Sequence, residues 1–371
     1  MRRVAFVFPG QGSQKVGMGS AWAAVSPAAR ATFDEADAAL GLPLARLCRE
    51  GPEEELNLTA NTQPALLAVS IAIHRALTAP EPPAGFAGPG SWPPLPRPVA
   101  MAGHSLGEWS GLVAAGALDL GDALRLVRRR GELMQEAVPV GVGAMAALLG
   151  VDAAAAAAIA RDAAAAEPGE VCTVANLNGP GQTVLAGHRR AIERAIVLAK
   201  ERGARKAALL PVSAPFHSPL MRPARLAMAE LLAATEFRDP EVPVVSNVDA
   251  APVTSGAAAR DALVRQIDSP VRWVESVEWM VAQGGVEALL EVGPGNVLSG
   301  LNRRIAGGVR AASLPDPEQL QRLLAGWQAA GTAVETENAA GAPAAAAAES
   351  SAAGAAETGN AAAAAAPAKE G

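Results

Sequence analysis

A serine flanked by two glycines is the first feature of this chain that could do chemistry. Residues 103–107 are Gly-His-Ser-Leu-Gly, the G-x-S-x-G pattern of a nucleophile elbow, with Ser105 as the nucleophile. Residues 98–102 before it predict a short buried strand, and the apolar spacing of residues 106–117 after it predicts a helix. A plain strand–helix turn is the alternative on these residues alone. The context favours a reactive serine at a strand-to-helix junction.

The two glycines have a steric reason to be there. A strained, outward-pointing serine brings the strand and the following helix so close that the positions two before and two after it have no room for a Cβ atom. We therefore expect a larger residue at Gly103 or Gly107 to disrupt the elbow.

His217 is the best candidate for a general base among the four histidines. It lies between Pro215 and Pro219, which stiffen the loop that carries it. His104 is adjacent to Ser105, but neighbouring side chains of a strand point to opposite faces, so we do not expect it to reach the hydroxyl. A loop histidine without a catalytic role remains the alternative for His217.

Arg130 interrupts an apolar stripe on a predicted helix that Asp119 caps and that ends near residue 136. Positions 123, 126, 127, 130, 133, 134 and 137 share one helical face, and they are Ala, Leu, Val, Arg, Leu, Met and Ala. An unpaired buried charge costs on the order of 3–5 kcal/mol, so the guanidinium needs an anion. A structural Asp or Glu and a substrate carboxylate are both possible partners.

The N-terminal strand, residues 4–8, is followed by a glycine-rich turn at residues 9–14. The third glycine of a G-x-G-x-x-G dinucleotide motif would fall on Lys15, and the chain has no P-loop pattern, which argues against nucleotide binding. Such a turn can expose backbone N–H groups, and the amide of Gln11 could form half of an oxyanion hole. A simple tight turn is the other interpretation.

Composition limits the remaining possibilities. Hydrophobic residues make up 50% of the 371 positions, but only 3% are aromatic and none is tyrosine, so we expect a core built from Ala, Leu and Val. Cys48 and Cys172 have neither metal-ligand nor disulfide-framework spacing, in agreement with a reducing compartment. The N-terminal apolar run is too short for a signal peptide, and no run approaches the ~18 apolar residues of a membrane span. We expect a cytoplasmic protein that binds neither nucleic acid nor membrane.

The order of predicted elements indicates an α/β fold with an inserted domain. Residues 138–210 alternate as β-α-β-β-α-β, the ferredoxin-like pattern of a small domain. Residues 1–137 and 211–329 form an α/β-hydrolase-like core with a parallel sheet, interrupted by a proline-rich surface loop at residues 80–98. Residues 330–371 are an Ala-rich tail with too few large apolar side chains to fold.

Taken together, the motifs resemble those of the malonyl-CoA:acyl-carrier-protein transacylase family, from about residue 4 to about residue 315. Several motifs in order are far more specific than any one of them. They are Phe-Pro-Gly-Gln-Gly-Ser-Gln at 8–14, Thr-Gln-Pro-Ala-Leu at 62–66, Gly-His-Ser-Leu-Gly-Glu at 103–108, Arg-Gly at 130–131 with Met-Gln at 134–135, Asn-Gly-Pro-Gly-Gln at 178–182, Phe-His-Ser at 216–218 and Glu-Val-Gly-Pro-Gly at 291–295.

This resemblance implies a role for each matching position. Ser105 would be acylated, with His217 as its base, and the amides of Gln11 and Leu106 would form the oxyanion hole. Arg130 would bind the malonyl carboxylate. The backbone carbonyl of Gln266 would orient the histidine, so that its side chain matters less than its position, and Phe216 would suit malonyl rather than a branched acyl group.

The resemblance also implies the reaction and its partners. Malonyl would pass from malonyl-CoA to an acyl carrier protein of fatty acid synthesis by a ping-pong route, without a cofactor or metal, and we expect a monomer. Residues 188–206 hold seven Lys or Arg against two Glu and form a candidate docking face for the acidic carrier; a solvated helix is the alternative.

Three other interpretations remain open at this point. A polyketide-synthesis acyltransferase would use the same chemistry. A serine hydrolase of the α/β class would share the elbow, but it carries an acid partner for its histidine and has no use for an arginine in its acyl pocket. A non-catalytic scaffold would be expected to lose Ser105 or His217. Departures from the family pattern are Trp109, the loop at 80–98 and the tail.

Overall fold

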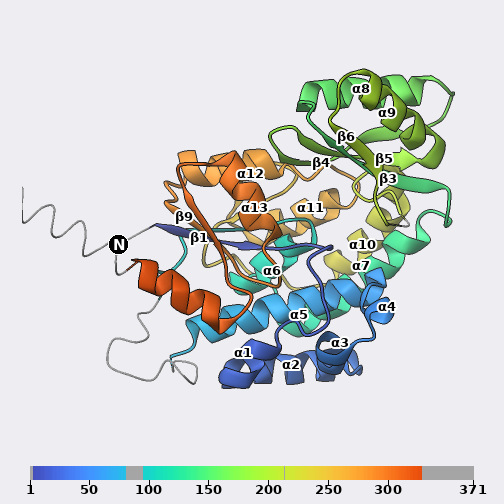
Figure 1. Cartoon of the computed structure of the whole chain (residues 1–371). Coiled ribbons are helices and arrows are strands. Elements are labelled where there is room, and N and C mark those ends of the chain that lie inside the picture. Colours follow the sequence, from blue (N-terminus) through green and yellow to red (C-terminus); the bar gives the residue numbers. More distant parts are fainter. Residues whose placement is uncertain (1–2, 81–94, 213, 328–371) are drawn as a thin grey trace, which may run out of the picture. The chain divides into compact units, whose positions relative to one another are not determined.

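Two β-sheets organise the first 324 residues of the chain (Figure 1). The computed structural model describes residues 3–80, 95–212 and 214–327. The larger sheet has the strand order β10-β9-β1-β2-β7-β8, and every neighbouring pair from β10 to β7 is parallel, whereas β7 and β8 are antiparallel. Its strands are β1 (Val4–Phe8), β2 (Ala100–Gly103), β7 (Val244–Val245), β8 (Pro252–Val253), β9 (Ala288–Glu291) and β10 (Arg310–Ser313).

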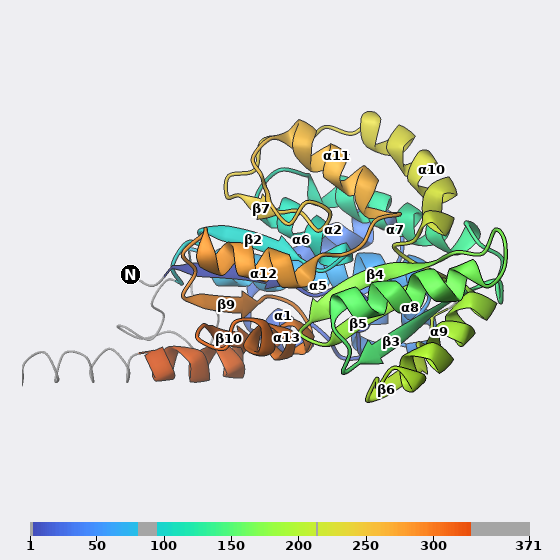
Figure 2. The same ribbon diagram turned by 90° about the horizontal axis from the view of Figure 1, so that it is seen from above.

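Helices cover both faces of this sheet, as expected when parallel strands are joined by helical crossovers. Helices α12 and α13 pack on one face and α6 on the other, with α5 and α7 packed around α6 (Figure 2). The helices of this part are α1 (Ser20–Val25), α2 (Pro27–Leu40), α3 (Leu44–Glu50), α4 (Glu53–Leu56), α5 (Thr59–Thr78), α6 (Leu106–Ala114), α7 (Leu120–Glu136), the 3-10 helix η1 (Pro219–Met221), α10 (Arg222–Ala233), α11 (Gly256–Gln266), α12 (Trp273–Ala282) and α13 (Val297–Ile305).

Strand β1 shows how the core is divided between the two faces. Its side chains alternate, as they must in a strand. Ala5 and Val7 pack with α12 and α13, whereas Phe6 and Phe8 meet the ring of His74 on α5 at centroid distances of 6.1 and 6.4 Å. Burying an aromatic side chain of this size is worth about 1.5–3 kcal/mol. The buried strand thus fixes the turn that follows it.

The smaller sheet has the strand order β4-β5-β3-β6, with every neighbouring pair antiparallel. Two helices pack against it through an apolar cluster rich in alanine. Its elements follow the β-α-β-β-α-β order, and the predicted α/β fold class with a ferredoxin-like insertion is confirmed. They are β3 (Gly143–Leu149), α8 (Ala153–Ala165), β4 (Cys172–Gly179), β5 (Gln182–His188), α9 (Arg189–Glu201) and β6 (Lys206–Leu209).

Backbone hydrogen bonds join the small sheet to the rest of the chain. Val271, just before α12, donates its N–H to the carbonyl of Ala175 and accepts from the N–H of Leu177, both at 2.9 Å. Asn176, between these two, is thereby held at the edge of β4 that faces the larger sheet's elements.

Several elements differ from the sequence-based expectation. The strand expected over residues 242–248 is reduced to the pair Val244–Val245. Its late start agrees with Pro243, which has no N–H to donate to a ladder. Helices α1, α3 and α4 and strands β8 and β10 were not predicted, since their segments are too short to show a period. Helix α2 was also not predicted, although its buried positions 29, 32, 33 and 36 have helical spacing. The domain boundaries at residues 137–138 and 210–211 remain a prediction. The tail and most of the proline-rich loop lie outside the described residues.

None of the helices in the described part of the chain combines the length and the apolar character needed to cross a membrane.

Candidate active site

Ser105 lies between β2 and α6 in a strained backbone conformation, with φ 52° and ψ −106°. The close approach predicted around it is confirmed. A Cβ atom on Gly103 would lie 1.8 Å from the carbonyl carbon of Gly107, and one on Gly107 would lie 2.0 Å from the carbonyl oxygen of Phe8. Such strain persists only where the surroundings hold it, and it is typical of functional positions.

Asn247 holds the backbone of the elbow from the end of β7. Its side-chain nitrogen donates to the carbonyl of Gly103, and its side-chain oxygen accepts from the N–H of Ser105, both at 2.7 Å. The side chain is fully buried. No local feature of the sequence marks this residue, because 142 positions separate it from the serine it supports.

His217 lies beside Ser105, with 2.7 Å between Nε2 and Oγ. Its Nδ1 is 2.9 Å from the backbone carbonyl of Gln266. A carbonyl oxygen only accepts, so Nδ1 carries the proton and Nε2 is free to accept one from the hydroxyl. His217 also has a positive φ of 58°, and Ser218 braces the loop by donating its hydroxyl to the carbonyl of Pro215 at 2.7 Å.

The histidine is held in its neutral form. Burial and, to a smaller extent, the nearby charge of Arg130 together lower the pKa of His217 to about 3, while the hydrogen bond to the carbonyl of Gln266 opposes the shift. At neutral pH the imidazole is therefore unprotonated at Nε2 and can act as a proton acceptor.

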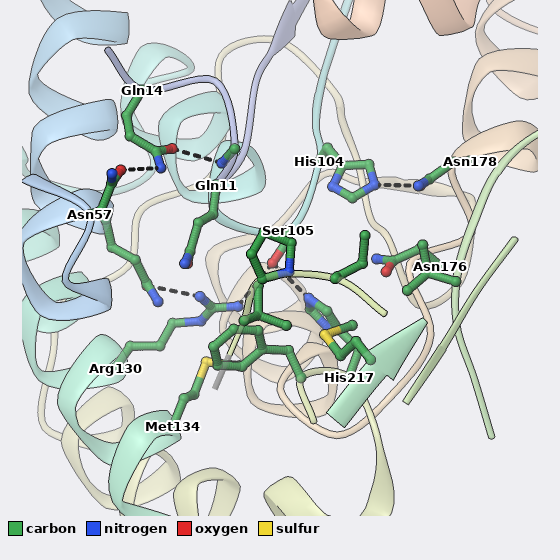
Figure 3. A pocket seen from close by; sticks show the side chains of 18 residues that line it. Gln11, Gln14, Asn57, His104, Ser105, Arg130, Met134, Asn176, Asn178 and His217 are labelled. Carbon is green, nitrogen blue, oxygen red and sulfur yellow. Dashed lines mark hydrogen bonds between the residues drawn. The ribbon is translucent and has the colours of Figure 1, made fainter. Parts of the chain in front are cut away.

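Arg130 projects from α7 toward Ser105 and is buried (Figure 3). Its Nη2 lies 3.2 Å from Ser105 Oγ and 2.9 Å from the side-chain oxygen of Gln266, and its Nη1 donates to the side-chain oxygen of Gln63 at 2.8 Å. Among the described residues, no carboxylate lies within 4.0 Å of the guanidinium. Its Nε has no hydrogen-bond partner there either.

Charge compensation for Arg130 is thus indirect. Burial lowers the pKa of Arg130 to about 10, and the carboxyl of Glu108 partly offsets this. The pKa remains well above neutral, so the side chain is a cation at neutral pH. A buried cation with neutral partners is a ready site for an anionic group of a substrate.

Glu108 lies in the first turn of α6 and is buried. Its Oε2 accepts from the backbone N–H of Asn247 at 3.0 Å and from the side-chain nitrogen of Gln266 at 2.7 Å. Burial raises the pKa of Glu108 to about 7, against the effect of these hydrogen bonds and of Arg130. The signal in the sequence was a carboxylate among the apolar residues at the start of that helix.

The side chain of Gln266, which was expected to matter less than the position of the residue, makes several hydrogen bonds of its own. Besides the backbone carbonyl that meets His217, the side chain bonds Arg130 and Glu108, and it donates to the carbonyl of Ser105 at 2.9 Å. The side chain is fully buried. Gln266 therefore contacts the serine, the histidine and the arginine at once.

Two backbone amides near Ser105 have no hydrogen-bond partner in the described part of the chain. Gln11 is in the turn after β1, and Leu106 is the first residue of α6. Neither of their N–H groups donates to any atom of the described residues. Gln14 braces the turn, because its side-chain oxygen accepts from the N–H of Gly12 at 2.7 Å and its nitrogen donates to Asn57 at 2.9 Å.

Gln11, Ser105, Arg130 and His217 line a cavity of about 520 Å³ that opens between the two sheets. Figure 3 shows Ser105 with Arg130 on one side and His217 on the other. Phe216 also lines the cavity. The opposite wall comes from the small sheet and the segment after it, through Met145, Asn176, Asn178, Val184, Leu210, Pro211 and Val212.

His104 contacts this opposite wall rather than the nucleophile. Its Nε2 is 2.8 Å from the side-chain oxygen of Asn178, and its ring is tilted against Trp273 at a centroid distance of 5.8 Å. The expectation that it does not act on Ser105 agrees with this geometry. No group of three or more His, Cys, Asp or Glu side chains arranged to hold a metal ion occurs in the described part of the chain.

Comparison with known proteins gives a consistent result. Residues 5–313 match the family described as the acyl transferase domain. The malonyl CoA-acyl carrier protein transacylase of Escherichia coli strain K12 is 51% identical over 324 residues, which are 87% of this chain and 99% of that protein. The Bacillus subtilis protein of the same name is 46% identical over 321 residues, which are 86% of this chain and 96% of that protein.

Solved structures agree. The acyl carrier protein S-malonyltransferase of Vibrio cholerae is similar with a TM-score of 0.80 and 47% identity, over 86% of this chain and 99% of that one. A malonyl-transacylase in complex with its type II PKS acyl-carrier protein is similar with a TM-score of 0.79 and 46% identity, over 86% of this chain and 97% of that one.

Proposed function

This chain belongs to the acyl transferase family, and we propose that it transfers the malonyl group of malonyl-CoA to the phosphopantetheine thiol of an acyl carrier protein. The names of its relatives support this activity, and the site supplies a physical reason for the malonyl group. The observation that carries the proposal is the buried guanidinium of Arg130, with neutral partners and with Nη2 3.2 Å from Ser105 Oγ.

The first half-reaction acylates the enzyme. The carboxylate of malonyl-CoA binds Arg130, and the thioester carbonyl lies beside Ser105. Oγ forms a bond with the carbonyl carbon while its proton passes to Nε2 of His217, and the amides of Gln11 and Leu106 stabilise the oxyanion. The carbon–sulfur bond then breaks, and the imidazolium returns the proton to the sulfur of coenzyme A.

The second half-reaction reverses these steps with a different thiol. The phosphopantetheine thiol of the carrier protein gives its proton to His217 and attacks the malonyl-serine ester. The tetrahedral intermediate collapses, and Ser105 recovers its proton from the imidazolium. Because coenzyme A leaves before the carrier binds, the kinetics are ping-pong. Each step uses groups of this one chain, which supports a monomer that needs no cofactor.

Selectivity follows from the charge of Arg130. A malonyl group gives the buried cation an anion, whereas an acetyl group leaves it unpaired in the acyl complex. Sites with buried polar groups discriminate strongly against analogues that cannot satisfy them. Phe216 lines the same cavity and limits the volume beside the acyl group, in keeping with the small malonyl unit.

Intact-mass measurement tests this function. After brief mixing with malonyl-CoA, we expect a malonyl adduct on the wild-type enzyme and none on Ser105→Ala. Addition of a phosphopantetheinylated carrier should remove the adduct and give malonyl-carrier. A wild-type enzyme that forms no adduct, or an adduct that the carrier thiol does not remove, would contradict the proposal.

A second candidate concerns the pathway rather than the chemistry. One similar structure is a malonyl-transacylase bound to a type II PKS acyl-carrier protein, so a polyketide carrier is the alternative acceptor to a fatty-acid carrier. Transfer rates to the two kinds of carrier separate these cases. A hydrolase of the same site would instead release free malonate as fast as it transfers.

The carrier protein is proposed to dock on residues 188–206, the basic segment named above. The structure changes which side chains in it are suited to that role. Arg194 donates to the carbonyl of Ala163 and is paired with Glu170, so it braces the small domain. Arg190, Arg205 and Lys206 are exposed and better placed to meet an acidic partner.

Charge reversal tests this docking surface. The triple variant Arg190→Glu, Arg205→Glu, Lys206→Glu should slow transfer to the carrier about tenfold or more and spare acylation by malonyl-CoA, since removing attractive surface charge lowers the association rate. The control reverses three exposed arginines elsewhere, Arg46, Arg49 and Arg310. Equal transfer rates in the two variants would eliminate this docking surface.

We also place the reaction in the cytoplasm. Cys48 and Cys172 are both free and buried, and burial raises the pKa of each thiol to about 12. Inert, unpaired thiols are what a reducing compartment favours.

A further inference from the structure

The side chain of Gln266 connects three parts of the site that come from different elements. It extends from the end of α11, bonds Arg130 of α7, and reaches both Glu108 of α6 and the carbonyl of Ser105. The backbone carbonyl of the same residue accepts from His217. The activity proposed above assigns a task to that carbonyl and none to the side chain.

The surroundings permit one orientation of the Gln266 amide. Glu108 Oε2 lies 2.7 Å and the carbonyl oxygen of Ser105 lies 2.9 Å from the same end of the amide. A carbonyl only accepts and a carboxylate does so when ionised, so this end is the NH₂ group. The other end is the oxygen, and it lies 2.9 Å from Nη2 of Arg130.

This orientation fixes the guanidinium. A guanidinium is planar and has only donors, so two acceptors on its two terminal nitrogens set both its position and its plane. Gln63 supplies one acceptor at 2.8 Å from Nη1, and Gln266 supplies the other. Both are neutral, so they position the cation without cancelling its charge. A carboxylate in either place would position it and cancel its charge.

We propose that the Gln266 side chain, oriented by Glu108 and the carbonyl of Ser105, is a positioning residue that holds Arg130 beside the nucleophile and thereby sets the preference for malonyl over acetyl. This inference rests on the malonyl transfer proposed above. Gln266 does so without touching the acyl group, through a neutral acceptor that leaves the cation available to the substrate carboxylate.

A purely structural role for the side chain makes a different prediction. A buried, fully bonded amide also stabilises the fold, and its loss would lower acylation by every donor in parallel. If the side chain positions Arg130, its loss lowers acylation by malonyl-CoA, the donor that uses Arg130, more than acylation by acetyl-CoA. The ratio of malonyl to acetyl acylation rates therefore separates the two roles.

Two nearly isosteric variants test the proposal. Any substitution retains the backbone carbonyl that meets His217, so Gln266→Met removes the acceptor on Arg130 and leaves that contact in place. Gln266→Glu keeps an oxygen there but adds a charge that neutralises the guanidinium. We expect the ratio of malonyl to acetyl kcat/KM to fall at least tenfold in both variants, with most of the change in KM for malonyl-CoA.

The control is Gln321→Met, the same change at an exposed position outside the site. It should keep the wild-type ratio, and thermal unfolding reports the folded state of each variant. A folded Gln266 variant with the wild-type ratio overturns the inference. So does parallel loss of both activities, including by failure to fold, because the side chain then serves the fold and not selectivity. Failure of the wild-type enzyme to prefer malonyl would instead overturn the proposed function.

Discussion

The two walls of the cavity are built in different ways. On the core side, hydrogen bonds connect Ser105, His217 and Arg130 to one another and to buried amides. Ser105 and His217 also have positive backbone φ angles, which residues other than glycine rarely adopt. On the small-domain side, the only hydrogen bond from a lining residue to the elbow region, among the described residues, is that between Asn178 and His104. Its other lining residues are mostly apolar.

This difference indicates a division of labour. Reacting groups have to be held within a fraction of an ångström, and that needs rigid elements and supporting hydrogen bonds. The small-domain wall holds none of the three reacting side chains, so it needs shape more than precision. A substitution on the core side should therefore lower stability or acylation rate far more than a comparable substitution on the small sheet.

The largest effect is expected from adding a methyl group to the elbow. Gly103→Ala should destabilise the fold by about 4 kcal/mol or more, because its Cβ would overlap backbone atoms of the next helix that cannot move aside. Gly179→Ala, on β4 of the small sheet, is the matched change, with its nearest neighbour 3.9 Å away, and should cost less than about 1 kcal/mol. Chemical denaturation measures both. Equal losses of stability in the two variants would contradict the difference between the two walls.

Removal of the cation comes next. Arg130→Ala should lower malonyl acylation by about 10²–10³-fold, or roughly 3–4 kcal/mol, because a buried charge contact to the substrate is lost. Acetyl acylation should persist or rise. Rapid-quench intact-mass measurements with both donors check this, and Arg129→Ala, whose side chain is exposed and paired with Glu132 and Glu136, is the control. Parallel loss with both donors would contradict the role of Arg130.

On the opposite wall, Asn178→Ala should lower malonyl acylation only several-fold. It removes one hydrogen bond, worth about 1 kcal/mol, from His104, which does not act on the nucleophile. Its effect should be the same for malonyl and acetyl donors, measured as kcat/KM. A loss as large as that of Arg130→Ala would show that the small sheet takes part in positioning the reacting groups.

The smallest expected effect concerns the pH dependence of acylation. Because burial and Arg130 lower the pKa of His217 from 6.5 to about 3, kcat/KM for acylation should stay level through pH 6.5 and fall only under more acidic conditions. Arg130→Ala should move this acidic limb upward, and Asn178→Ala should leave it in place. Acylation rates between pH 4 and 8 test this, and a limb at pH 6.5 in the wild-type enzyme would contradict it.

The same shift affects stability, with a definite sign. The unfolded chain protonates this histidine near pH 6.5 and the folded chain only near 3, so His217 lowers the free energy of unfolding as pH falls through that window. Glu108 acts in the opposite sense. Its folded pKa of about 7 exceeds the ordinary 4.5, so its contribution is full below pH 4.5 and is lost as pH rises toward 7.

The sequence predicted those parts of the site that depend on local spacing. The elbow around Ser105 was evident from two glycines between a strand and a helix, and Arg130 from its place in an apolar stripe. His217 came from its proline-flanked loop and was selected among four histidines by elimination and by family resemblance. The α/β order and the ferredoxin-like insertion followed from the alternation of strands and helices.

The supporting residues could not be found in this way. Asn247 and Gln266 lie 142 and 161 positions from the serine whose backbone they hold, and nothing local marks either as a contact of the elbow. Gln63 belongs to the motif at residues 62–66, but its hydrogen bond with Arg130 was not predicted. Contacts of this kind depend on the packing of several helices on one sheet edge, which no single stretch of sequence encodes.

All four strands of the small sheet come from one continuous segment of the chain, which is inserted between α7 and His217. This inserted segment contributes none of the three reacting side chains. An engineer could therefore graft a related insertion between those two points to change which thioester donors are admitted, while the reactive centre keeps its original scaffold.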